Sequence, residues 1–289
     1  MVICLAVLIL IILLLVLNKK DEEPAAPDPH EGQVYLYDGF DWIWMTPLEG
    51  VPVNTITADY FSDSKTDPRF IGKGYTVKRG IDVSEHQYDI DWPMAAQSGI
   101  DYAYIRLGRR GTTEGGLFED EYYYKNMDGA LASGLDVGVY FYSQAISVSE
   151  AIEEANFVLD RLGSYKISLP IIFDSEKYEG GDARTDNLSS ETRTECAVAF
   201  CGTIENAGYD AGIYFNRNIG YYGCDLSRLT DFSFWFALPE STFPNFYYKV
   251  DMWQYSFVYE VPGIEGEVDM NYMFIPDEPE ISADESENA

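Results

Sequence analysis

The sequence predicts an α/β protein whose main domain is an irregular closed barrel of eight strands. From residue 77 onward, strand-like runs alternate with helical runs, and this alternation indicates a parallel sheet. Eight strand-like runs are present, which is the number that closes a parallel sheet into a barrel. The last three runs have little helical sequence between them, so the barrel is expected to be irregular. A length of 289 residues suits one such domain with additional segments.

The strand-like runs are rich in β-branched and aromatic residues. They cover residues 77–84, 101–107, 137–142, 169–173, 211–215, 232–237, 250–255 and 267–274. Between the third and fourth runs, Ser147 to Glu150 has the pattern of a capping box, and apolar residues then recur at helical spacing until Gly163. Residues 192–207 have the same character and are followed by Gly208, so a helix is expected in each stretch.

Residues 1–18 are predicted to form a transmembrane anchor. Residues 1–17 are almost wholly aliphatic, which is the short end of a membrane-spanning helix. The basic n-region and small-residue cleavage site of a signal peptide are missing, which favours an uncleaved anchor. We expect a single-pass protein of the cell membrane with the barrel outside the cell. Lys19 and Lys20 follow the span and favour the opposite orientation, so the flanking charges are ambiguous.

Three further segments flank the barrel, which is expected at residues 79–275. Residues 19–33 are rich in proline and acidic residues and indicate an extended linker. Residues 34–78 are aromatic and predict a small β-rich extension packed on the barrel. This extension is too short to be a good free-standing carbohydrate-binding module without a disulfide or metal. Residues 276–289 hold six acids and no base, which predicts a disordered acidic tail.

Composition excludes some classes of partner and cofactor. The formal net charge of −30 argues against nucleic acid, because a phosphate backbone requires basic patches. With two histidines and no Cys/His cluster of metal-ligand spacing, neither a zinc site nor any other cofactor is expected. Cys196 and Cys201 are five apart on one expected helix, too distant to bridge easily. Cys224 can meet either of them, but buried free thiols are favoured.

Two carboxylates follow the most strand-like apolar run of the chain. Residues 170–173 end in Asp174 and Glu176, with Ser175 between them. On a strand, residues i and i+2 point to the same face, so both acids are expected to project from the C-terminal end of a buried strand, where parallel α/β proteins carry their chemistry. Two carboxylates in one cleft keep different pKa values, and one of them stays protonated near neutral pH. The alternative is a solvated strand end, because 49 acids produce roughly eight such triplets by chance.

Other strand-like runs also carry polar and aromatic groups. Asp82 lies in the first run, Tyr140 near the end of the third and Trp253 in the seventh. Asp269 and Asn271 stand two residues apart in the eighth run. When the barrel closes, the first, fourth and eighth strands bring their carboxylates to the same end. A plain strand-end cap is the alternative for Asp82.

The ordered set of these stretches resembles family 25 of the glycoside hydrolases, the muramidase-type lysozymes. The resemblance covers about residues 79–274 and rests on Arg79-Gly80-Ile81-Asp82-Val83-Ser84, Tyr104-Ile105-Arg106, Gly138-Val139-Tyr140, Asp174-x-Glu176, Gly212-Ile213-Tyr214, Phe234-Trp235-Phe236-Ala237, Trp253-Gln254-Tyr255 and Val268-Asp269-Met270-Asn271. It implies an irregular TIM-like (β/α)5β3 barrel with five helices. It also implies hydrolysis of the β-1,4 bond between N-acetylmuramic acid and N-acetylglucosamine in peptidoglycan. The chain departs from the family at Phe141, where histidine is usual.

The resemblance also implies roles for the four acids. Glu176 resembles the general acid that protonates the leaving oxygen. Asp174 is similar to the residue that stabilises positive charge at the sugar ring, either by orienting the 2-acetamido group or by direct electrostatics. Asp82 and Asp269 resemble supporting acids that set pKa values, hold water and bind the sugar.

The remaining candidates are substrate-binding residues by the same resemblance. Tyr140 and Tyr214 are expected to line the cleft and Trp253 to be a sugar platform, with plain core packing as the alternative for all three. Asn271 is expected to bind substrate. Arg106 is either a substrate contact or a buried ion-pair partner for a barrel acid.

Three functions are compatible with these observations. The first is a membrane-anchored, monomeric muramidase whose partner is the glycan strand of peptidoglycan. The second is a non-catalytic protein that binds cell-wall glycan on the same barrel. The third is another barrel glycosidase such as a chitinase, whose longer acidic signature requires acids where Leu169 and Ile172 stand.

Overall fold

The computed structural model describes residues 28–178 and 180–277, which form two units. Within the first unit, residues 28–35 and 44–47, the ring of His30 stacks on Trp44 with centroids 4.0 Å apart. Strands β1 (Val34–Tyr37) and β2 (Trp42–Met45) pair in a two-stranded sheet. The predicted anchor, residues 1–18, lies outside the described residues, as do residues 19–27 of the linker and 278–289 of the tail. Among the residues described, none of the helices has both the length and the apolar character needed to span a membrane.

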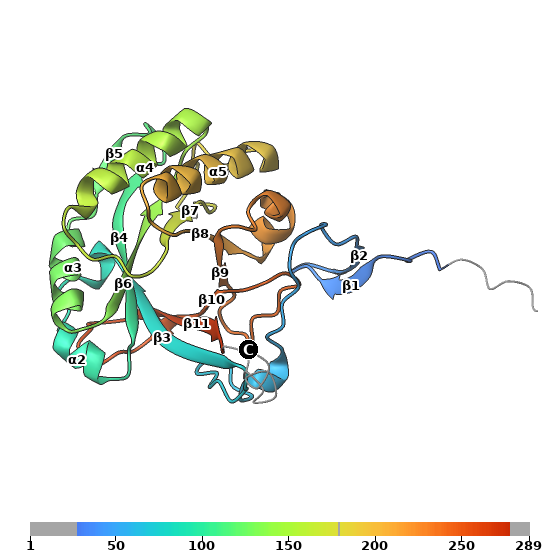
Figure 1. The fold of residues 1–289 in the computed structure, drawn as a ribbon, viewed down its shortest axis with the longest axis horizontal. Helices are drawn as coiled ribbons and strands as arrows, with labels where there is room; N and C mark the ends of the chain where they lie inside the picture. The colour runs from blue at the N-terminus through green and yellow to red at the C-terminus, as the bar shows by residue number, and fades with distance from the viewer. Residues whose placement is uncertain (1–27, 179, 278–289) are drawn as a thin grey trace, which may run out of the picture. The chain divides into compact units, whose positions relative to one another are not determined.

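Eight strands of the second unit, residues 36–43 and 48–277, close into a barrel (Figure 1). They are β3 (Tyr75–Val83), β4 (Tyr102–Arg110), β6 (Asp136–Tyr142), β7 (Ile171–Asp174), β8 (Ala211–Asn216), β9 (Ser233–Ala237), β10 (Met252–Tyr259) and β11 (Val268–Pro276). Their order is β3-β11-β10-β9-β8-β7-β6-β4, and a β3–β4 pairing closes the ring. Strand β11 is antiparallel to both neighbours, whereas the other barrel pairs are parallel. The predicted irregular α/β barrel is therefore confirmed. A short strand, β5 (Leu117–Glu119), pairs with the end of β4.

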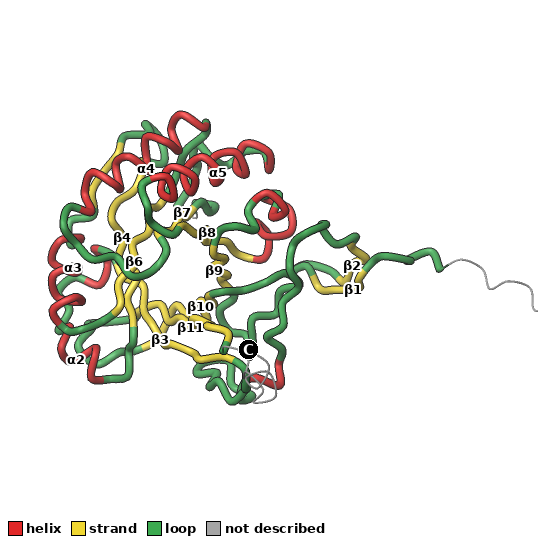
Figure 2. The backbone as a smooth tube through the Cα atoms, in the orientation of Figure 1, coloured by secondary structure: helices red, strands yellow, loops and turns green. Residues whose placement is uncertain are grey.

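Helices pack on the outside of the barrel along β4, β6, β7 and β8 (Figure 2). They are α2 (Trp92–Gln97), α3 (Tyr123–Ala132), α4 (Val148–Leu162) and α5 (Ser190–Asn206). The Ser147 side chain caps α4 by accepting the Glu150 N–H. The Glu150 carboxylate accepts the N–H of Ile146 at 2.9 Å instead of that of Ser147, so the expected capping box is only half formed.

The five helices implied by the resemblance are not all present. The part of the chain that the structure describes contains four α-helices. The β8–β9 connection instead holds a π-helical turn (Ile219–Gly223) and a 3-10 turn (Leu226–Arg228). Two glycines, Gly220 and Gly223, lie in this connection and disfavour a longer helix. Further 3-10 turns are Ala58–Tyr60 and Glu85–Gln87.

The stretch before the barrel contributes to it directly. The N–H of Asn54 donates to the carbonyl of Tyr247 at 2.9 Å, and the ring of Phe61 lies edge-on to Trp253 at 5.2 Å. Strand β3 begins at Tyr75, four residues before the predicted domain boundary at residue 79. Residues 75–78 belong to the barrel because they pair antiparallel with the end of β11.

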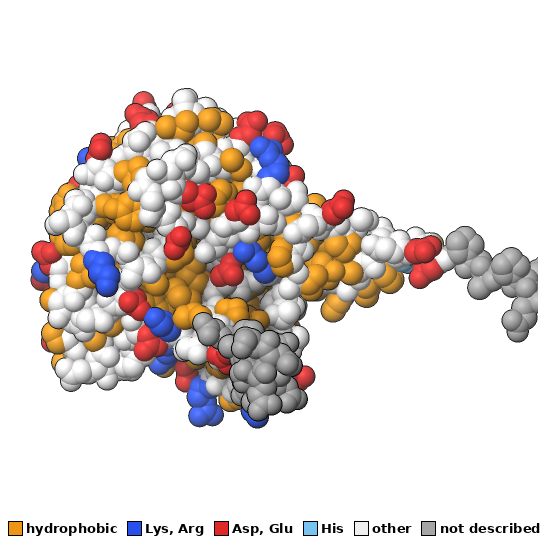
Figure 3. All heavy atoms as spheres, in the orientation of Figure 1, with side chains coloured by type: hydrophobic (Ala, Val, Ile, Leu, Met, Phe, Trp, Pro, Cys, Tyr) orange, Lys and Arg blue, Asp and Glu red, His pale blue; other side chains and the backbone are white. Residues whose placement is uncertain are grey.

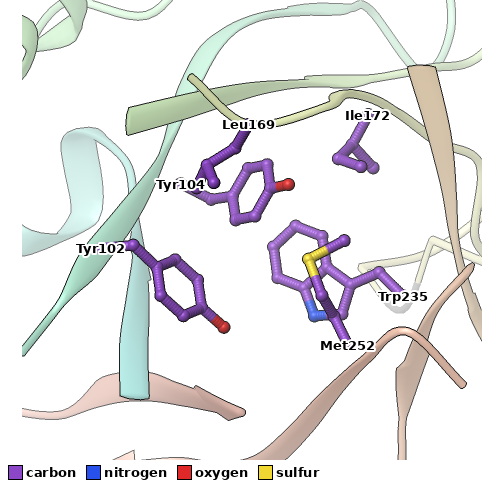
Figure 4. Packing of buried hydrophobic residues seen from close by; sticks show 6 residues of the cluster. All are labelled: Tyr102, Tyr104, Leu169, Ile172, Trp235 and Met252. Carbon is purple, nitrogen blue, oxygen red and sulfur yellow. The ribbon is translucent and has the colours of Figure 1, made fainter. Parts of the chain in front are cut away.

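Large side chains fill the barrel interior (Figure 4). Six of them form one buried layer: Tyr102, Tyr104, Leu169, Ile172, Trp235 and Met252. Glycines on neighbouring strands make room for the tyrosines. A Cβ on Gly80 would lie 2.3 Å from the ring of Tyr102, and a Cβ on Gly138 would lie 2.4 Å from that of Tyr104. Tyr140 and Tyr214 pack against the layer, which therefore supports the barrel mouth from below.

Outside the barrel interior, the described cysteines Cys196, Cys201 and Cys224 are buried and unbridged, as favoured from the sequence.

Candidate active site

A cavity of about 700 Å³ opens at the mouth of the barrel. Every barrel strand contributes a lining residue: Asp82, Arg106, Tyr140, Asp174, Tyr214, Trp235, Gln254 and Asp269. The loop after β7 adds Glu176. Because the parallel strands end at this mouth and antiparallel β11 begins there, side chains distant in the sequence meet at one place.

The four predicted acids Asp82, Asp174, Glu176 and Asp269 all line this cavity, and we call them the mouth acids. Asp82 on β3 is the register partner of Asp269 on β11. One carboxylate oxygen of Asp82 accepts hydrogen bonds from the amide nitrogens of Gln254 and Asn271 at 2.8 and 2.7 Å. The Gln254 amide also donates to Asp269 at 3.0 Å.

Asp82 and Asp269 influence each other's protonation. Burial raises the pKa of both carboxyl groups, and the charge of Asp82 raises the pKa of Asp269 further. The hydrogen bond between them lowers the pKa of Asp82 and raises that of Asp269. The proton therefore resides on Asp269, and the two amide donors favour the ionised form of Asp82.

Alternation along the chain presents Asp174 and Glu176 to the cavity. Ser175, between them, is held from the opposite side by Arg193 of α5, whose guanidinium donates to its hydroxyl at 2.7 Å and to its carbonyl at 3.1 Å. Asp174 is 6% exposed, and its Oδ1 has no hydrogen-bond partner among the described residues. Burial and the charges of Glu176 and Asp82 raise the pKa of Asp174 well above its usual range, and Arg106 opposes this only in part.

Arg106 is fixed by acids outside the group of mouth acids. Its Nε donates to Asp120 at 2.8 Å, and its Nη2 pairs with Glu85 at 2.9 Å. The predicted ion-pair alternative is therefore present, although its partners differ from those expected. Arg106 also lines the cavity, and its charge lowers the pKa of Tyr140 and Asp174. It therefore acts on the mouth acids without being neutralised by them.

Tyr140 and Tyr214 line the cavity as predicted. The hydroxyl of Tyr214 donates to Oε1 of Gln254 at 2.7 Å. This hydrogen bond fixes the orientation of the Gln254 side-chain amide, so its nitrogen points toward Asp82 and Asp269.

Two predicted substrate contacts are corrected by the structure. Trp253 is fully buried outside the cavity lining, and its indole N–H donates to the carbonyl of Leu238 at 3.1 Å. Its ring packs on Phe61, so it offers no face to a sugar. Asn271 is also fully buried, and it bridges Asp82 and the indole N–H of Trp235 below the cavity. Asn271 therefore positions an acid and does not reach the cavity.

Among the cavity residues that the sequence analysis does not single out are Tyr142, Trp235 and Gln254. Strand register is the signal that would find them. Tyr142 is the register partner of Asp174, and Trp235 is the register partner of Tyr214. Gln254 can be recognised as a cavity residue only when its neighbour Trp253 is assigned to the outer face of β10, because adjacent residues of a strand point to opposite faces.

The chain is similar to curated proteins of one kind. It is 28% identical over 194 residues to the autolytic lysozyme of Clostridium acetobutylicum, with 67% of this chain and 55% of that protein covered. It is 25% identical over 217 residues to Lysozyme M1 of Streptomyces globisporus, with 71% of each chain covered. The chain thus spans little more than half of the first relative.

Solved structures show the same fold. The modular autolysin LytC from Streptococcus pneumoniae, in complex with a synthetic peptidoglycan ligand, has a TM-score of 0.61 at 23% identity, with 84% of this chain and 56% of that chain covered. The bacterial lysozyme from Streptomyces coelicolor has a TM-score of 0.58 at 24% identity, with 67% of this chain and 90% of that chain covered.

The family assignment comes from the barrel sequence itself. The model of glycosyl hydrolases family 25 matches residues 81–264, from near the end of β3 to just before β11. This range is well over half of the chain and includes all the mouth acids except Asp269. The chain therefore belongs to family 25 of the glycosyl hydrolases.

Proposed function

We propose that this protein is a muramidase, which cleaves the β-1,4 bond between N-acetylmuramic acid and N-acetylglucosamine in peptidoglycan. The observation that carries the proposal is the gathering of four carboxyl groups in one cavity, where burial raises the pKa of Asp82, Asp174 and Asp269 and the charge of neighbouring carboxylates raises that of Asp174 and Asp269 further. Glycoside hydrolysis requires one protonated and one ionised carboxyl group beside the scissile bond. The lysozymes among its relatives support the same activity.

The coupling between Asp174 and Glu176 supplies the required asymmetry. The charge of Glu176 raises the pKa of Asp174, so a proton on Glu176 favours ionisation of Asp174 beside Arg106. In this state Glu176 donates its proton to the leaving oxygen. The carboxylate of Asp174 then stabilises positive charge at the sugar, through the 2-acetamido group or directly.

Asp82 and Asp269 support this reaction and do not carry it. The proton that they hold between them keeps the net charge of the mouth low, which limits the electrostatic cost of ionising Asp174 nearby. Gln254 and Asn271 hold Asp82 in place through two hydrogen bonds. Tyr140, Tyr142 and Tyr214 line the path of the glycan.

The setting of the enzyme is part of the proposal. The aliphatic residues 1–17 support an anchor in the cell membrane, with the barrel outside and acting on the wall as a monomer. The acidic, proline-rich residues 19–33 then serve as a linker, residues 34–78 as an extension and residues 276–289 as an acidic tail.

The test is digestion of purified peptidoglycan by the wild type and by Glu176→Gln. The substitution keeps size and removes the transferable proton, so release of reducing ends is expected to fall by about 10²–10⁴-fold. Asp174→Asn is expected to reduce it in the same range, and circular dichroism checks that both variants fold. Mass spectrometry identifies the new reducing end. Muramic acid supports the proposal, whereas glucosamine or undiminished activity of Glu176→Gln contradicts it.

A further inference from the structure

Two basic residues line the cavity in addition to Arg106 and Arg110. Arg109, on β4, and Lys177, directly after Glu176, both line the cavity. Neither takes part in an ion pair within residues 28–178 and 180–277. The chain has 19 basic and 49 acidic residues, and acids are spread over the face shown in Figure 3. Two basic side chains in one cavity, neither in an ion pair among the described residues, are therefore unusual for so acidic a protein.

Strand register places Arg109 beside the reacting groups and not among them. Arg109 is the register partner of Tyr142, and Tyr142 is the register partner of Asp174. Two strand spacings separate Arg109 from Asp174, which is roughly 10 Å between their backbones. Neither Arg109 nor Lys177 is among the groups that shift the pKa of Asp174 or Asp269. Arg109 and Lys177 therefore do not control the protonation of these two acids.

Arg109 and Lys177 lie near the C-terminal ends of β4 and β7, and the loops that follow these two strands are held together. The loop after β4 and the loop after β7 are joined by the N–H of Arg184, which donates to the carbonyl of Thr112 at 2.9 Å. The side chain of Arg184 also pairs with Glu150 of α4 at 2.7 Å. Arg109 itself lies over the ring of Phe118 on β5, 5.0 Å from its centroid. This cation–π contact orients the guanidinium without neutralising it.

We propose that Arg109 and Lys177 form a subsite for carboxylate groups carried by the glycan. The inference rests on the proposed muramidase function and specifies which substrates it prefers. A guanidinium binds a carboxylate through two parallel hydrogen bonds, and a lysine adds a point charge. Muramic acid supplies such carboxylates in two ways: through its lactyl group when no peptide is attached, and through the stem peptide when one is.

The experiment compares three soluble glycan strands: peptide-bearing strands, the same strands with their carboxyl groups blocked as amides, and peptide-free strands with free lactyl carboxylates. The variants are Arg109→Gln, Lys177→Gln and the double variant. Arg228→Gln and Lys125→Gln are matched controls, because both residues are exposed and neither lines the cavity.

The double variant is expected to lose about tenfold in kcat/KM on strands with free carboxylates, through a higher KM, because a charge-assisted hydrogen bond is lost. The double variant is expected to match the wild type on the blocked strands. The control variants are expected to match the wild type on all three kinds of strand. A loss on peptide-bearing strands alone identifies the stem peptide as the source, and a loss on peptide-free strands identifies the lactyl group. An equal loss on all three strands, or no loss on any, overturns the subsite.

Binding gives a second readout that separates the two proposals. Titration calorimetry of the three strands with Glu176→Gln measures affinity without turnover. Carboxylate-dependent affinity that disappears in Glu176→Gln/Arg109→Gln/Lys177→Gln supports the subsite even if the wild type cleaves none of the strands, a result that would refute only the muramidase function. Cleavage by the wild type with affinity that ignores the carboxylates would refute only the subsite.

Discussion

Two groups of ionisable side chains in this barrel, each with buried members, compensate their charges in different ways. The mouth acids face amide donors and each other, and Asp174 keeps an unpartnered oxygen among the described residues. In the other group, which we call the Arg110 cluster (Arg110, Glu150, Glu153, Glu154 and Arg184), a buried guanidinium bonds to two glutamates. Arg110 donates to Glu154 and to Glu153, each at 2.7 Å.

The difference shows which buried acids are structural. Burial raises the pKa of Glu154 to about 7, although Arg110 and the Ser143 hydroxyl both lower it. The guanidinium and the carboxylate are nevertheless direct partners in an ion pair. At the mouth, the charge of a neighbouring carboxylate adds to burial in raising the pKa of Asp174 and Asp269, so a proton held within each interacting pair of acids reduces their repulsion where Glu154 has a cation. Variants of the Arg110 cluster are therefore expected to change stability, and variants of the mouth acids to change activity and its pH dependence.

The largest expected effect on stability is that of Glu154→Ala. The side chain of Glu154 is fully buried between Arg110 and Ser143, so its removal leaves a buried guanidinium without its inner partner. Breaking a buried pair in this way costs about 3–5 kcal/mol of unfolding free energy. Chemical denaturation measures this cost.

Glu153→Ala is the matched control for Glu154→Ala. Glu153 bonds to the same guanidinium at the same distance, but its side chain is 59% exposed. Exposed pairs contribute about 0–1 kcal/mol, so the control should change little. Equal costs for the two variants would show that burial does not set the value of these ion pairs.

A smaller effect is expected in the pH dependence of Asp269→Asn. The folded protein holds a proton on Asp269 that the unfolded chain releases near pH 4, so the contribution of this carboxyl group to stability falls as pH rises above that value. The asparagine side chain keeps a hydrogen-bond donor toward Asp82 and has no proton to lose. The variant should gain stability relative to the wild type by up to about 1.4 kcal/mol per pH unit between pH 4 and 7, as measured by thermal unfolding.

Asp136→Asn tests the sign of that result. The ion pair with Lys78 lowers the pKa of Asp136, so its stabilising contribution is present at neutral pH and is lost as pH falls. Asp136→Asn should therefore be less stable than the wild type at pH 7 and approach it near pH 3. Parallel profiles for the Asp136 and Asp269 variants would mean that net charge, and not these individual groups, controls the pH dependence.

The sequence predicts the barrel and its acids because both follow from periodicity. Alternating strands and helices indicate the sheet, and acids at strand ends meet when it closes. The sequence does not show which residues of β10 face the barrel interior. Its first five residues, 252–256, are all buried, so no alternation of polar and apolar residues marks the inner face. An error of one residue exchanges Trp253 for Gln254. Asn271 lies on the same face as Asp269 but deeper in the barrel, and sequence spacing does not report depth.

The smallest effect is expected for Tyr214→Phe, which removes the hydroxyl that orients the Gln254 amide toward the mouth acids. The Tyr214 hydroxyl donates to Oε1 of Gln254, which leaves Nε2 to donate to Asp82 and Asp269. Without that hydroxyl the side-chain amide can turn and present oxygen to the acids, so activity should fall a few-fold and stability by about 0.5–1.5 kcal/mol. Tyr102→Phe is the control, because its buried hydroxyl has no hydrogen-bond partner among the described residues. If the two variants behave alike, the orientation of Gln254 does not control the mouth acids, and their proton must be held by burial alone.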